Sequence, residues 1–383
     1  MKDFRFMIPQ NIQFGLGSLK KLPELLRENG SDNVLLVSDR GLEKVGVVKK
    51  VQDIITAGGI KCTSYLDVLP NPTVEIVNEA TALYKECGAT SIVALGGGSP
   101  MDVSKAVGVL VKHGGKITDY EGTQVVPGPI VPIIAIPTTA GTGSEATPSA
   151  VITDVSRSWK FSVFSYEVLP KYAILDPELI MTAPASIAAP CGVDALIHAI
   201  EAYLSKNATP FSDAMAEKAM ELIGGNLRRF VANRQDEEAA CAMMLGSTFA
   251  GISFAWARLG LVHAMSHPVS AFFGVTHGTA NSILLPTILE FNALTDQGRY
   301  EVIYNYVRRG TGRVDNFEPS MLVDEIRQLN RDLKIPACLA EAGVTADRFP
   351  EMAEDTMKSG NYFANPRMAT KQDIIDLYYK ALN

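Results

Sequence analysis

The chain has 383 residues, of which 47% are hydrophobic, and its formal net charge is −7. A chain of this length predicts two domains, because one domain usually holds about 100–200 residues. The mildly acidic balance, with no block of lysine or arginine, argues against a nucleic-acid partner, which would require a basic surface.

The cysteines and the first residues bear on the compartment. Five scattered cysteines without a C-x-x-C pair argue against a disulfide framework and fit a reducing environment. The opening MKDFRFMIPQ lacks the apolar stretch of a signal peptide. We therefore expect a cytoplasmic protein.

Short apolar runs alternate with helical segments over residues 1–180. The runs at 34–37, 91–95 and 133–136 predict strands, and the segments 41–58 and 101–113 predict helices. Strands separated by helices form a parallel sheet with helices on its faces. We therefore expect residues 1–180 to form an α/β domain.

The rest of the chain, from Pro184 onward, has long helical periodicities and few strand signals. The expected helices are 191–204, 210–231, 237–254, 259–273, 279–292 and 319–333. This change predicts an all-α domain over residues 181–383, with the boundary near Asp176-Pro177-Glu178.

One uncharged stretch resembles a membrane span in composition. Residues 259–289 contain no Asp, Glu, Lys or Arg, but they include Pro268, Pro286 and three histidines. Such interruptions favour a buried interior around a polar site over a membrane span. We expect no membrane partner.

A glycine-rich turn follows the second predicted strand. Gly96, Gly97 and Gly98 allow a backbone to approach a diphosphate closely, and the helix start that follows offers free N–H groups. In this interpretation Ser99 is the N-cap, Pro100 the first helical residue, and Asp102 lies in the first turn. The alternative is a tight turn without a ligand, since the full dinucleotide motif G-x-G-x-x-G is absent.

Two further segments suit a nucleotide. Asp39 ends the first predicted strand, where a carboxylate can bind a ribose 2′-hydroxyl and repel a 2′-phosphate, or can simply serve the turn before Gly41. Residues 137–145, PTTAGTGSE, are rich in hydroxyls and glycine after a third strand, as in a phosphate-binding loop or a plain solvent loop.

Four of the five histidines lie in the helical half of the chain. Asp194 and His198 are four residues apart and project from one helix face, and His263 and His267 repeat this spacing. His277 follows ten residues later. One carboxylate and three imidazoles make a nitrogen and oxygen site for a divalent first-row metal, although spacing alone leaves open which three histidines bind. Satisfied core histidines are the alternative.

These motifs together resemble the iron-containing, or group III, alcohol dehydrogenase family. The resemblance runs from Phe14-Gly15-x-Gly17 to Asn365-Pro366-Arg367. The motifs that carry it are Gly96-Gly97-Gly98-Ser99-Pro100-x-Asp102, Pro137-Thr-Thr-Ala-Gly-Thr-Gly-Ser-Glu145, Gly192-x-Asp194-Ala-x-x-His198-x-x-Glu201 and His263-Ala-Met-x-His267-Pro with His277-Gly278.

The resemblance implies a dinucleotide-binding α/β domain, a helical metal domain and a cleft between them. It implies Asp194, His198, His263 and His277 as the metal ligands, and His267 as an active-site residue that contacts substrate or relays a proton. The cofactor residues that it implies are Asp39, Asn71, Gly97, Gly98, Ser99, Asp102, Thr138, Thr139, Thr147, Lys160 and Leu179.

The family forms its substrate pocket around the positions of Ser149, Phe254, Arg258, Asn361 and Phe363. Ser149, Arg258 and Asn361 differ from the residues found in many members, so the substrate is not implied. Arg258 or Lys160 is a candidate for recognising an anionic substrate group, and an interdomain salt bridge is the alternative.

The expected reaction is hydride transfer between a small primary alcohol or diol and NAD, giving the aldehyde, and the reverse reduction of the aldehyde. A bound metal would act as a Lewis acid on the alcohol oxygen. Iron is the first choice from the family, and zinc also fits the ligands. The resemblance also implies a homodimer or a larger homo-oligomer. The alternatives are a polyol dehydrogenase of the glycerol type, or a metal-dependent lyase or hydrolase without net redox chemistry.

Overall fold

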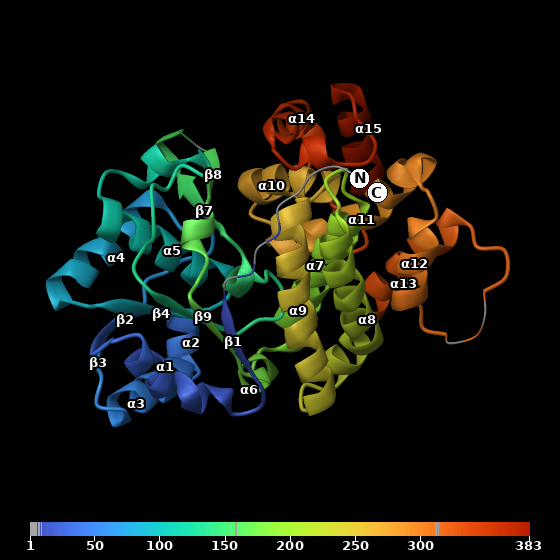
Figure 1. Ribbon diagram of the computed structural model, residues 1–383. Coiled ribbons are helices and arrows are strands. Elements are labelled where there is room, and N and C mark those ends of the chain that lie inside the picture. Colours follow the sequence, from blue (N-terminus) through green and yellow to red (C-terminus); the bar gives the residue numbers. More distant parts are fainter. Residues whose placement is uncertain (1–5, 7, 9, 158, 311, 313) are drawn as a thin grey trace. The chain divides into compact units, whose positions relative to one another are not determined.

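The computed structural model describes residues 6, 8, 10–157, 159–310, 312 and 314–383. The chain divides into two compact units (Figure 1). The first is Met7–Ala183, and the second is Pro184–Asn383, to which Phe6 also belongs. Phe6 joins the second unit because its ring packs against Phe211 and Trp256, with ring centroids 5.1 and 5.3 Å away.

A six-stranded parallel sheet forms the centre of the first unit. Its strand order is β1-β9-β6-β4-β2-β3. The strands are β1 (Asn11–Phe14), β2 (Asn33–Val37), β3 (Lys61–Tyr65), β4 (Ser91–Gly96), β6 (Ile133–Pro137) and β9 (Tyr172–Leu175). The strands β4 and β6 are buried along their whole length, because helices cover both faces of a parallel sheet.

Alternate residues of the strands enter two separate apolar cores. Leu35 and Val37 of β2 pack on the face covered by α4 (Val74–Cys87) and α5 (Gly98–His113). Val34 and Leu36 pack on the opposite face, against α1 (Leu22–Glu28) and α3 (Val47–Ala57) (Figure 1). The period of two along each strand therefore builds the layered α/β arrangement.

The order of the strands reverses between β2 and β4. From β2 the chain first adds β3 on one side and then crosses to β4 on the other side. In open parallel sheets, ligands bind beyond the carboxyl ends of the two strands at such a point. These ends are Ser38-Asp39 after β2 and Gly97-Gly98 after β4.

Two features of this unit differ from the sequence-based expectations. The helix expected over 41–58 is two helices, α2 (Arg40–Lys44) and α3, because Gly46 adopts a left-handed φ of 81°. A second sheet of β5 (Gly122–Thr123), β7 (Ser149–Asp154) and β8 (Trp159–Phe164) contains an antiparallel pair that was not expected. The unit ends with α6 (Pro177–Met181).

The second unit is built of helices throughout its described residues. They are α7 (Ala185–Leu204), α8 (Pro210–Ala232), α9 (Glu237–Ala257), α10 (Leu261–Phe273), α11 (His277–Asn292), α12 (Arg299–Val307), α13 (Pro319–Asp332), α14 (Phe349–Lys358) and α15 (Lys371–Leu382). The helices α7, α8 and α9 pack closely because Gly192 has no side chain. A Cβ there would lie 2.4 Å from Leu227 Cδ1.

Two described helices, α7 and α9, are long and apolar enough to cross a membrane. In their most apolar windows 78% and 72% of the residues are buried inside the structure, as in core helices. The uncharged stretch 259–289 forms α10 and most of α11, and these helices are also largely buried.

Candidate active site

Asp39 stands at the carboxyl end of β2 as the N-cap of α2. Its Oδ1 accepts a hydrogen bond from the Leu42 amide at 3.0 Å. The carboxylate therefore serves the turn before Gly41, as one interpretation of the sequence required. The side chain is half-buried, and only one of its oxygens makes this bond, so the same group retains capacity to accept a bond from a ligand.

The glycine turn after β4 starts α5 earlier than expected. Gly97 is the N-cap and Gly98 the first helical residue, so the expectation that Ser99 caps the helix is wrong. The reason is backbone geometry: Gly96 adopts a φ of 146°, a conformation open to glycine, and the chain turns into the helix at once. The helix N-terminus thus offers bare backbone N–H groups with no side-chain cap.

The loop after β6 lies directly against this turn. A Cβ on Gly97 would lie 3.3 Å from Thr139 Oγ1, and one on Gly98 would lie 3.1 Å from Thr142 Cγ2. The Thr138 amide donates to the Gly96 carbonyl at 3.0 Å. Backbone amides and threonine hydroxyls from two strand ends are therefore brought together, which is the chemistry that binds phosphate.

Lys105, which the sequence analysis missed, holds the continuation of that loop. It is fully buried, and its Nζ lies 2.7–3.0 Å from the carbonyls of Ser144, Thr147 and Ser149 and from Ser144 Oγ. A lysine about two helical turns after Gly98 was the available signal. Burial lowers the Lys105 pKa to about 8, against the charge of Asp102.

Asp102 and Lys160 lie in the same region. Burial raises the pKa of Asp102 to about 6, while Lys105 and a hydrogen bond from Ser144 Oγ at 3.1 Å act against that rise. Lys160 donates to Asn71 Oδ1 at 2.6 Å, and Asn71 adopts a left-handed φ of 56°. The two remaining cofactor candidates, Thr147 and Leu179, are buried; Leu179 packs in the core that contains α3.

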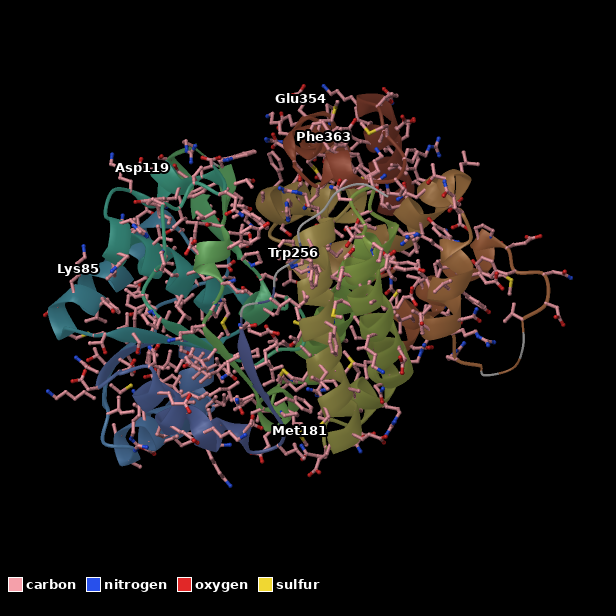
Figure 2. All side chains as sticks on the ribbon, viewed as in Figure 1. Lys85, Asp119, Met181, Trp256, Glu354 and Phe363 are labelled. Atoms are coloured by element: carbon pink, nitrogen blue, oxygen red, sulfur yellow. The ribbon has the colours of Figure 1, made fainter. Side chains whose placement is uncertain are left out.

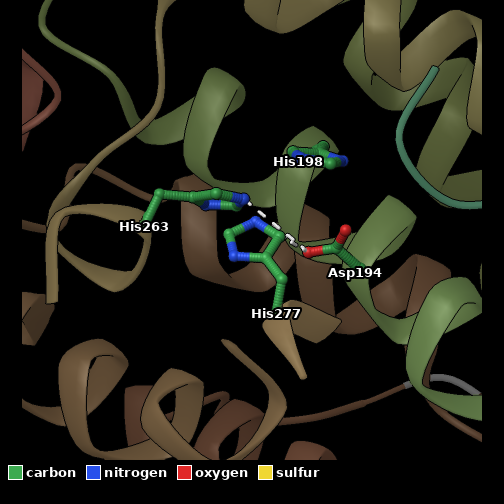
Figure 3. A group of neighbouring side chains, drawn as sticks. All are labelled: Asp194, His198, His263 and His277. Carbon is green, nitrogen blue, oxygen red and sulfur yellow. Dashed lines mark ion pairs between the residues drawn. The ribbon is translucent and has the colours of Figure 1, made fainter. Parts of the chain in front are cut away.

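The second unit brings one carboxylate and three imidazoles together (Figure 3). Asp194 and His198 come from one face of α7, His263 from α10 and His277 from the start of α11. Their potential ligand atoms all lie within 4.8 Å of one another. Gly278 allows this approach, because a Cβ there would lie 2.6 Å from the carbonyl oxygen of Pro190 in α7.

The protonation states suit a metal. Burial and neighbouring imidazoles lower the pKa of His263 and of His277 well below the ordinary 6.5, so both rings are neutral with a free lone pair. Burial alone would raise the pKa of Asp194, but the three imidazoles and an amide bond from Asn281 hold it below its ordinary value. A carboxylate and neutral imidazoles are the donors that Fe²⁺ and Zn²⁺ take.

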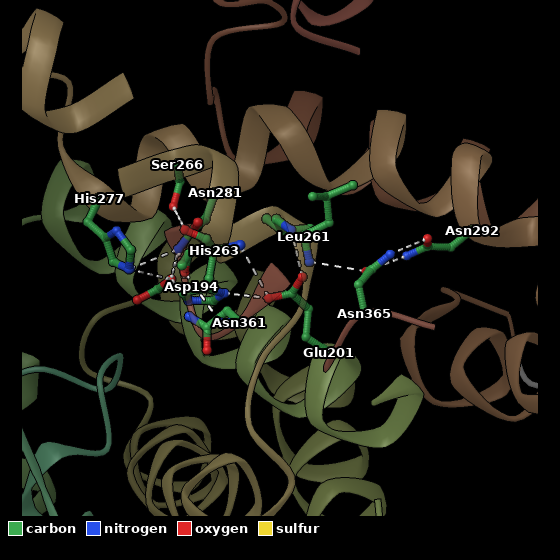
Figure 4. Close-up of polar contacts among 12 residues, drawn as sticks. Asp194, Glu201, Leu261, His263, Ser266, His277, Asn281, Asn292, Asn361 and Asn365 are labelled. Carbon is green, nitrogen blue, oxygen red and sulfur yellow. Dashed lines mark hydrogen bonds and ion pairs between the residues drawn. The ribbon is translucent and has the colours of Figure 1, made fainter. Parts of the chain in front are cut away.

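The contacts of Asn281 show that the proposed ligand atoms face a common point. Its Nδ2 lies 2.6 Å from Asp194 Oδ1 and 3.1 Å from both His263 Nε2 and His277 Nε2 (Figure 4). Three acceptor atoms thus converge on one donor position. The donor set and its convergence fit a divalent cation.

Glu201, another residue that sequence reasoning left without a role, fixes the orientation of His263. The side chain is buried, and its Oε2 lies 2.6 Å from His263 Nδ1 while Oε1 accepts from the Val262 amide at 2.7 Å (Figure 4). Because Nδ1 is bonded to Glu201, the other ring nitrogen of His263, Nε2, faces Asp194 Oδ1 at 3.7 Å. The signal was present: Asp194, His198 and Glu201 lie four and three residues apart on one helix face.

His267 lies beside the four converging residues without joining them. Its ring stacks on His277 with centroids 5.4 Å apart and meets His263 edge-on at 6.4 Å. Phe254 stacks on His198 at 4.5 Å. These two rings are the immediate aromatic neighbours of the cluster.

The other substrate-pocket candidates are divided between the units. Arg258 ends α9 with a left-handed φ of 63°, and a Cβ on Gly360 would lie 3.6 Å from its Nη1. Asn361, next in the chain, is among the residues drawn in Figure 4, and its amide donates to Ser359 Oγ at 3.3 Å. Phe363 is 62% exposed (Figure 2). Ser149 belongs to the first unit, where its carbonyl accepts from Lys105.

A parallel sheet with a strand reversal and a buried Asp/His₃ cluster are the features expected of a metal-dependent dehydrogenase. Comparisons with known proteins agree. Residues 9–177 match the iron-containing alcohol dehydrogenase family model, and residues 188–382 match the model of the C-terminal part of the Fe-containing family. The chain belongs to the iron-containing alcohol dehydrogenase family.

Individual relatives cover the whole chain. Lactaldehyde reductase from Escherichia coli strain K12 is 37% identical over 380 residues, covering 98% of this chain and 99% of its own length. The crystal structure of a 1,3-propanediol oxidoreductase matches with a TM-score of 0.96 and 35% identity over 100% of both chains. Sulfoacetaldehyde reductase from Bifidobacterium kashiwanohense, solved with NAD⁺, matches with a TM-score of 0.90 and 29% identity, covering 100% of this chain and 99% of its own.

The expectations of an α/β unit with a parallel sheet, a helical metal-domain fold and this family are thereby confirmed. The protein is an oxidoreductase that interconverts alcohols and aldehydes with a nicotinamide cofactor.

Proposed function

We propose that the enzyme interconverts a small polar primary alcohol and its aldehyde using NAD(H) and one divalent metal ion. The observation that carries this proposal is the convergence of Asp194, His198, His263 and His277 within 4.8 Å. These four residues would hold the ion. Iron is our first choice from the family, and zinc suits the same donors.

When bound, the metal supplies Lewis acidity that polarises the aldehyde carbonyl, and NAD(H) supplies the hydride chemistry. The protein supplies orientation. Glu201 holds His263 with its Nε2 toward the other ligands, and Asn281 donates to Asp194. The neutral state of His263 and His277 keeps their lone pairs available at neutral pH.

The imidazole of His267 is our candidate for the proton step. One ring nitrogen would accept the proton of the alcohol hydroxyl during oxidation and return it during aldehyde reduction. Its ring stacks on that of His277, with the ring centroids 5.4 Å apart, so it lies beside the proposed metal ligands.

Several features support NAD as the cofactor. The strand reversal between β2 and β4 brings Asp39 beside the glycine turn, where a carboxylate favours a ribose 2′-hydroxyl over a 2′-phosphate. The bare N-terminus of α5 and the hydroxyls of Thr138 and Thr139 suit a diphosphate. We assign Asn71, Gly97, Gly98, Ser99, Asp102, Thr147, Lys160 and Leu179 to the same site.

We propose a substrate that carries a second polar group. Relatives that act on lactaldehyde and 1,3-propanediol support this class by name. Phe254 would provide an apolar wall, and Asn361 and Arg258 would bind the second polar group. The resemblance adds Ser149 of the first unit and Phe363 of the second as further candidates for substrate contact.

An anionic substrate is the sharper version of this proposal. A guanidinium binds a carboxylate or sulfonate more strongly than a hydroxyl. Arg258→Ala should then lower kcat/KM for acidic aldehydes about tenfold more than for neutral aldehydes of the same length. Equal losses for both would eliminate the recognition of an anion by Arg258. Lys160 is a weaker candidate for this role because it already donates to Asn71 at 2.6 Å.

The whole proposal is tested by an aldehyde panel with NADH and NADPH on metal-free protein reconstituted separately with iron and zinc. We expect NADH oxidation with short hydroxyaldehydes only after metal is restored, and loss of both metal binding and activity in Asp194→Ala. Full activity without metal, or in Asp194→Ala, would contradict it.

We also propose that the protein is cytoplasmic and assembles as a homodimer or larger homo-oligomer. The first rests on the cysteine usage, and the second on the family. Light scattering during size-exclusion chromatography measures the assembly. A mass of one 41.3 kDa chain would overturn the second proposal.

A further inference from the structure

The carboxamide of Asn281 lies at the centre of the metal cluster. Asn281 is on α11, one turn after His277, and is fully buried. Its Nδ2 contacts Asp194 Oδ1 at 2.6 Å, and His263 Nε2 and His277 Nε2 at 3.1 Å each. A single amide nitrogen therefore faces the acceptor atoms of three of the four proposed ligands.

The other end of the same amide has no partner. Among the described residues, Asn281 Oδ1 is one of the buried side-chain oxygens without a hydrogen bond. Turning the amide over would place this oxygen against the Asp194 carboxylate and two imidazole lone pairs, which repel it. The proposed ligands therefore fix the orientation of the amide, and its oxygen is left buried without a hydrogen bond.

Without a donor, the three acceptors would repel one another. Asp194 presents a carboxylate oxygen, His263 presents the lone pair of Nε2 because its Nδ1 is bonded to Glu201, and His277 presents its Nε2 at 3.1 Å from the same amide nitrogen. The other nitrogen of His263, Nδ1, is already bonded to Glu201, so this ring cannot rotate to relieve the repulsion without losing that bond. The Asn281 NH₂ carries two hydrogens and lies within hydrogen-bond distance of all three acceptors.

We propose that Asn281 is a positioning residue for the metal ligands. Before the ion binds, it holds Asp194, His263 and His277 with their acceptor atoms facing one point. When the ion binds, the Asn281 amide loses its contacts with the two imidazoles. It keeps its bond to Asp194, because a carboxylate can accept from the amide and bind an ion at the same time. This inference rests on the metal assignment made above.

This role predicts whether Asn281 strengthens or weakens metal binding. Displacing the amide from two imidazoles opposes metal binding, but a water molecule would occupy the same lone pairs if the amide were absent, and it would also have to leave. The two displacements largely cancel. What remains is the convergence of the ligands, which the amide maintains and a mobile water does not, so removing Asn281 should weaken metal binding.

The experiment compares metal dissociation constants of full-length metal-free variants. Co²⁺ and Zn²⁺ are titrated in competition with a chelator of known affinity, and thermal unfolding is recorded without metal. Asn281→Ala removes the amide, and Asn281→Leu removes it while keeping the side-chain volume. We expect both to raise the dissociation constant about tenfold to a hundredfold, the usual range for residues that orient ligands. The visible absorption bands of the Co²⁺ form should also change.

Asn330 on α13 is the matched control. It is also buried, its Oδ1 also lacks a partner, and its Nδ2 donates to the Ser282 carbonyl of α11 at 2.7 Å. Asn330→Ala should lower the unfolding temperature to a similar extent but change the metal dissociation constant by less than about twofold, and leave the Co²⁺ bands unchanged.

Three results would overturn the inference: wild-type affinity in both Asn281 variants, wild-type affinity in Asn281→Leu alone, or an equal loss in Asn330→Ala. The second would mean that packing matters and the donor does not. If Asn281→Ala does not fold, Asn281→Leu decides. If the wild-type protein itself bound neither ion, the metal assignment would fail first and this inference with it.

Discussion

At Asp39 one carboxylate serves two purposes that can be separated by substitution. Its Oδ1 caps α2 at 3.0 Å from the Leu42 amide, and its charge would repel the 2′-phosphate of NADP. Asparagine caps a helix as well as aspartate does but carries no charge. Asp39→Asn should therefore leave the unfolding temperature nearly unchanged and raise kcat/KM for NADPH relative to NADH by about tenfold to a hundredfold.

Asp39→Ala is the companion variant. It removes both the charge and the cap, so it should relax the cofactor preference similarly and also cost about 1 kcal/mol of stability. Steady-state kinetics with both cofactors and thermal unfolding measure the two effects. If the NADPH to NADH ratio stayed at its wild-type value in both variants, Asp39 would not set the cofactor preference.

Glu201 offers a second prediction at the scale of one residue. Burial raises the pKa of this carboxyl to about 7, although the backbone amides that it accepts from act against the rise. In Glu201→Gln one polar terminus becomes an NH₂, which would face either the Val262 amide or His263 Nδ1, both of which donate. His263 then loses its fixed orientation, and the metal dissociation constant should rise about tenfold to a hundredfold.

The control for Glu201 is a buried glutamate of the other unit. Glu145 is 2% exposed and lies in the loop held by Lys105. Glu145→Gln should change stability but not metal affinity in a chelator competition. A similar loss of metal affinity in both variants would indicate a general effect of altering a buried carboxylate.

At the scale of elements, the loop after β6 depends on a single helix residue. Lys105 donates to the carbonyls of Ser144, Thr147 and Ser149, of which the Ser144 carbonyl also accepts from Thr147 at 3.4 Å. Lys105→Met keeps the length of the side chain and removes this donor from the carbonyls of Thr147 and Ser149, at about 1–3 kcal/mol each. We expect a loss of roughly 3 kcal/mol or more in unfolding free energy.

The same substitution should raise KM for NAD(H) more than it lowers kcat, because the loop forms part of the proposed cofactor site and not of the metal cluster. Lys112→Met, at an exposed position of the same helix, should be neutral within about 0.5 kcal/mol. Denaturant unfolding and cofactor kinetics make both measurements. A Lys105→Met variant with wild-type stability would show that the buried ammonium does not hold the loop.

The central strands could be predicted because they are buried on both faces. β2, β4 and β6 contain continuous apolar runs, which are closed by Ser38-Asp39, Gly96 and Pro137 respectively. The edge strand β3, with the sequence KCTSY, is mostly only half-buried and carries no such run. Its pairing with β2 depends on contacts distant in sequence, which local patterns do not encode.

One helix of the first unit was missed and the start of another was misplaced. α4 was missed although Thr73 caps its start and Gly88, with a left-handed φ of 64°, ends it. The start of α5 was misplaced because Ser99 suits an N-cap, whereas the backbone freedom of Gly96 and Gly97 turns the chain two residues earlier.

The metal site could be predicted in part, because residues four apart lie on the same face of a helix. The i, i+4 spacing placed Asp194 with His198 and His263 with His267, but spacing could not choose among His263, His267 and His277. That choice depends on how closely α11 approaches α7, which the close contact of Gly278 with Pro190 makes possible. The resemblance, and not the spacing, named the four residues that the structure brings within 4.8 Å.

At the scale of the whole molecule, the proposed metal ties together three helices of one unit. Its ligands come from α7, α10 and α11, so binding stabilises only states in which these helices are assembled. A ligand at a thousand times its dissociation constant adds about 4 kcal/mol to the stability of the state that binds it. Removing the metal with a chelator should therefore lower the unfolding temperature of the helical unit.

Hydrogen exchange locates this effect. Metal removal should increase exchange in α7, α10 and α11 and leave the sheet strands β2 and β4 unchanged, because these strands belong to the other unit and its separate cores. Readdition of Zn²⁺ should restore the protection. Equal loss of protection in β2 and β4 would contradict a metal site confined to the helical unit.

The dependence of stability on pH sums over all titrating groups, and Asp102 acts against the general trend. Most shifted carboxyls here have lowered pKa values, such as Asp154 at about 2, and they stabilise the fold above their unfolded pKa. Burial instead raises the pKa of Asp102 from 3.8 to about 6. Between these two values the folded state binds more protons than the unfolded state, so the contribution of Asp102 to stability falls as the pH rises from about 4 to 6.

Asp102→Asn removes this titration while keeping an oxygen that can accept from Ser144. The stability of the variant minus that of the wild type should increase between pH 4 and 6, by about 3 kcal/mol at most, and stay level above pH 7. Subtracting the two curves cancels the carboxyls that both proteins share, so the change isolates one group from the whole-molecule sum. A difference that stayed constant from pH 4 to 7 would mean that Asp102 is charged throughout that range, and that the ammonium of Lys105 compensates fully for its burial.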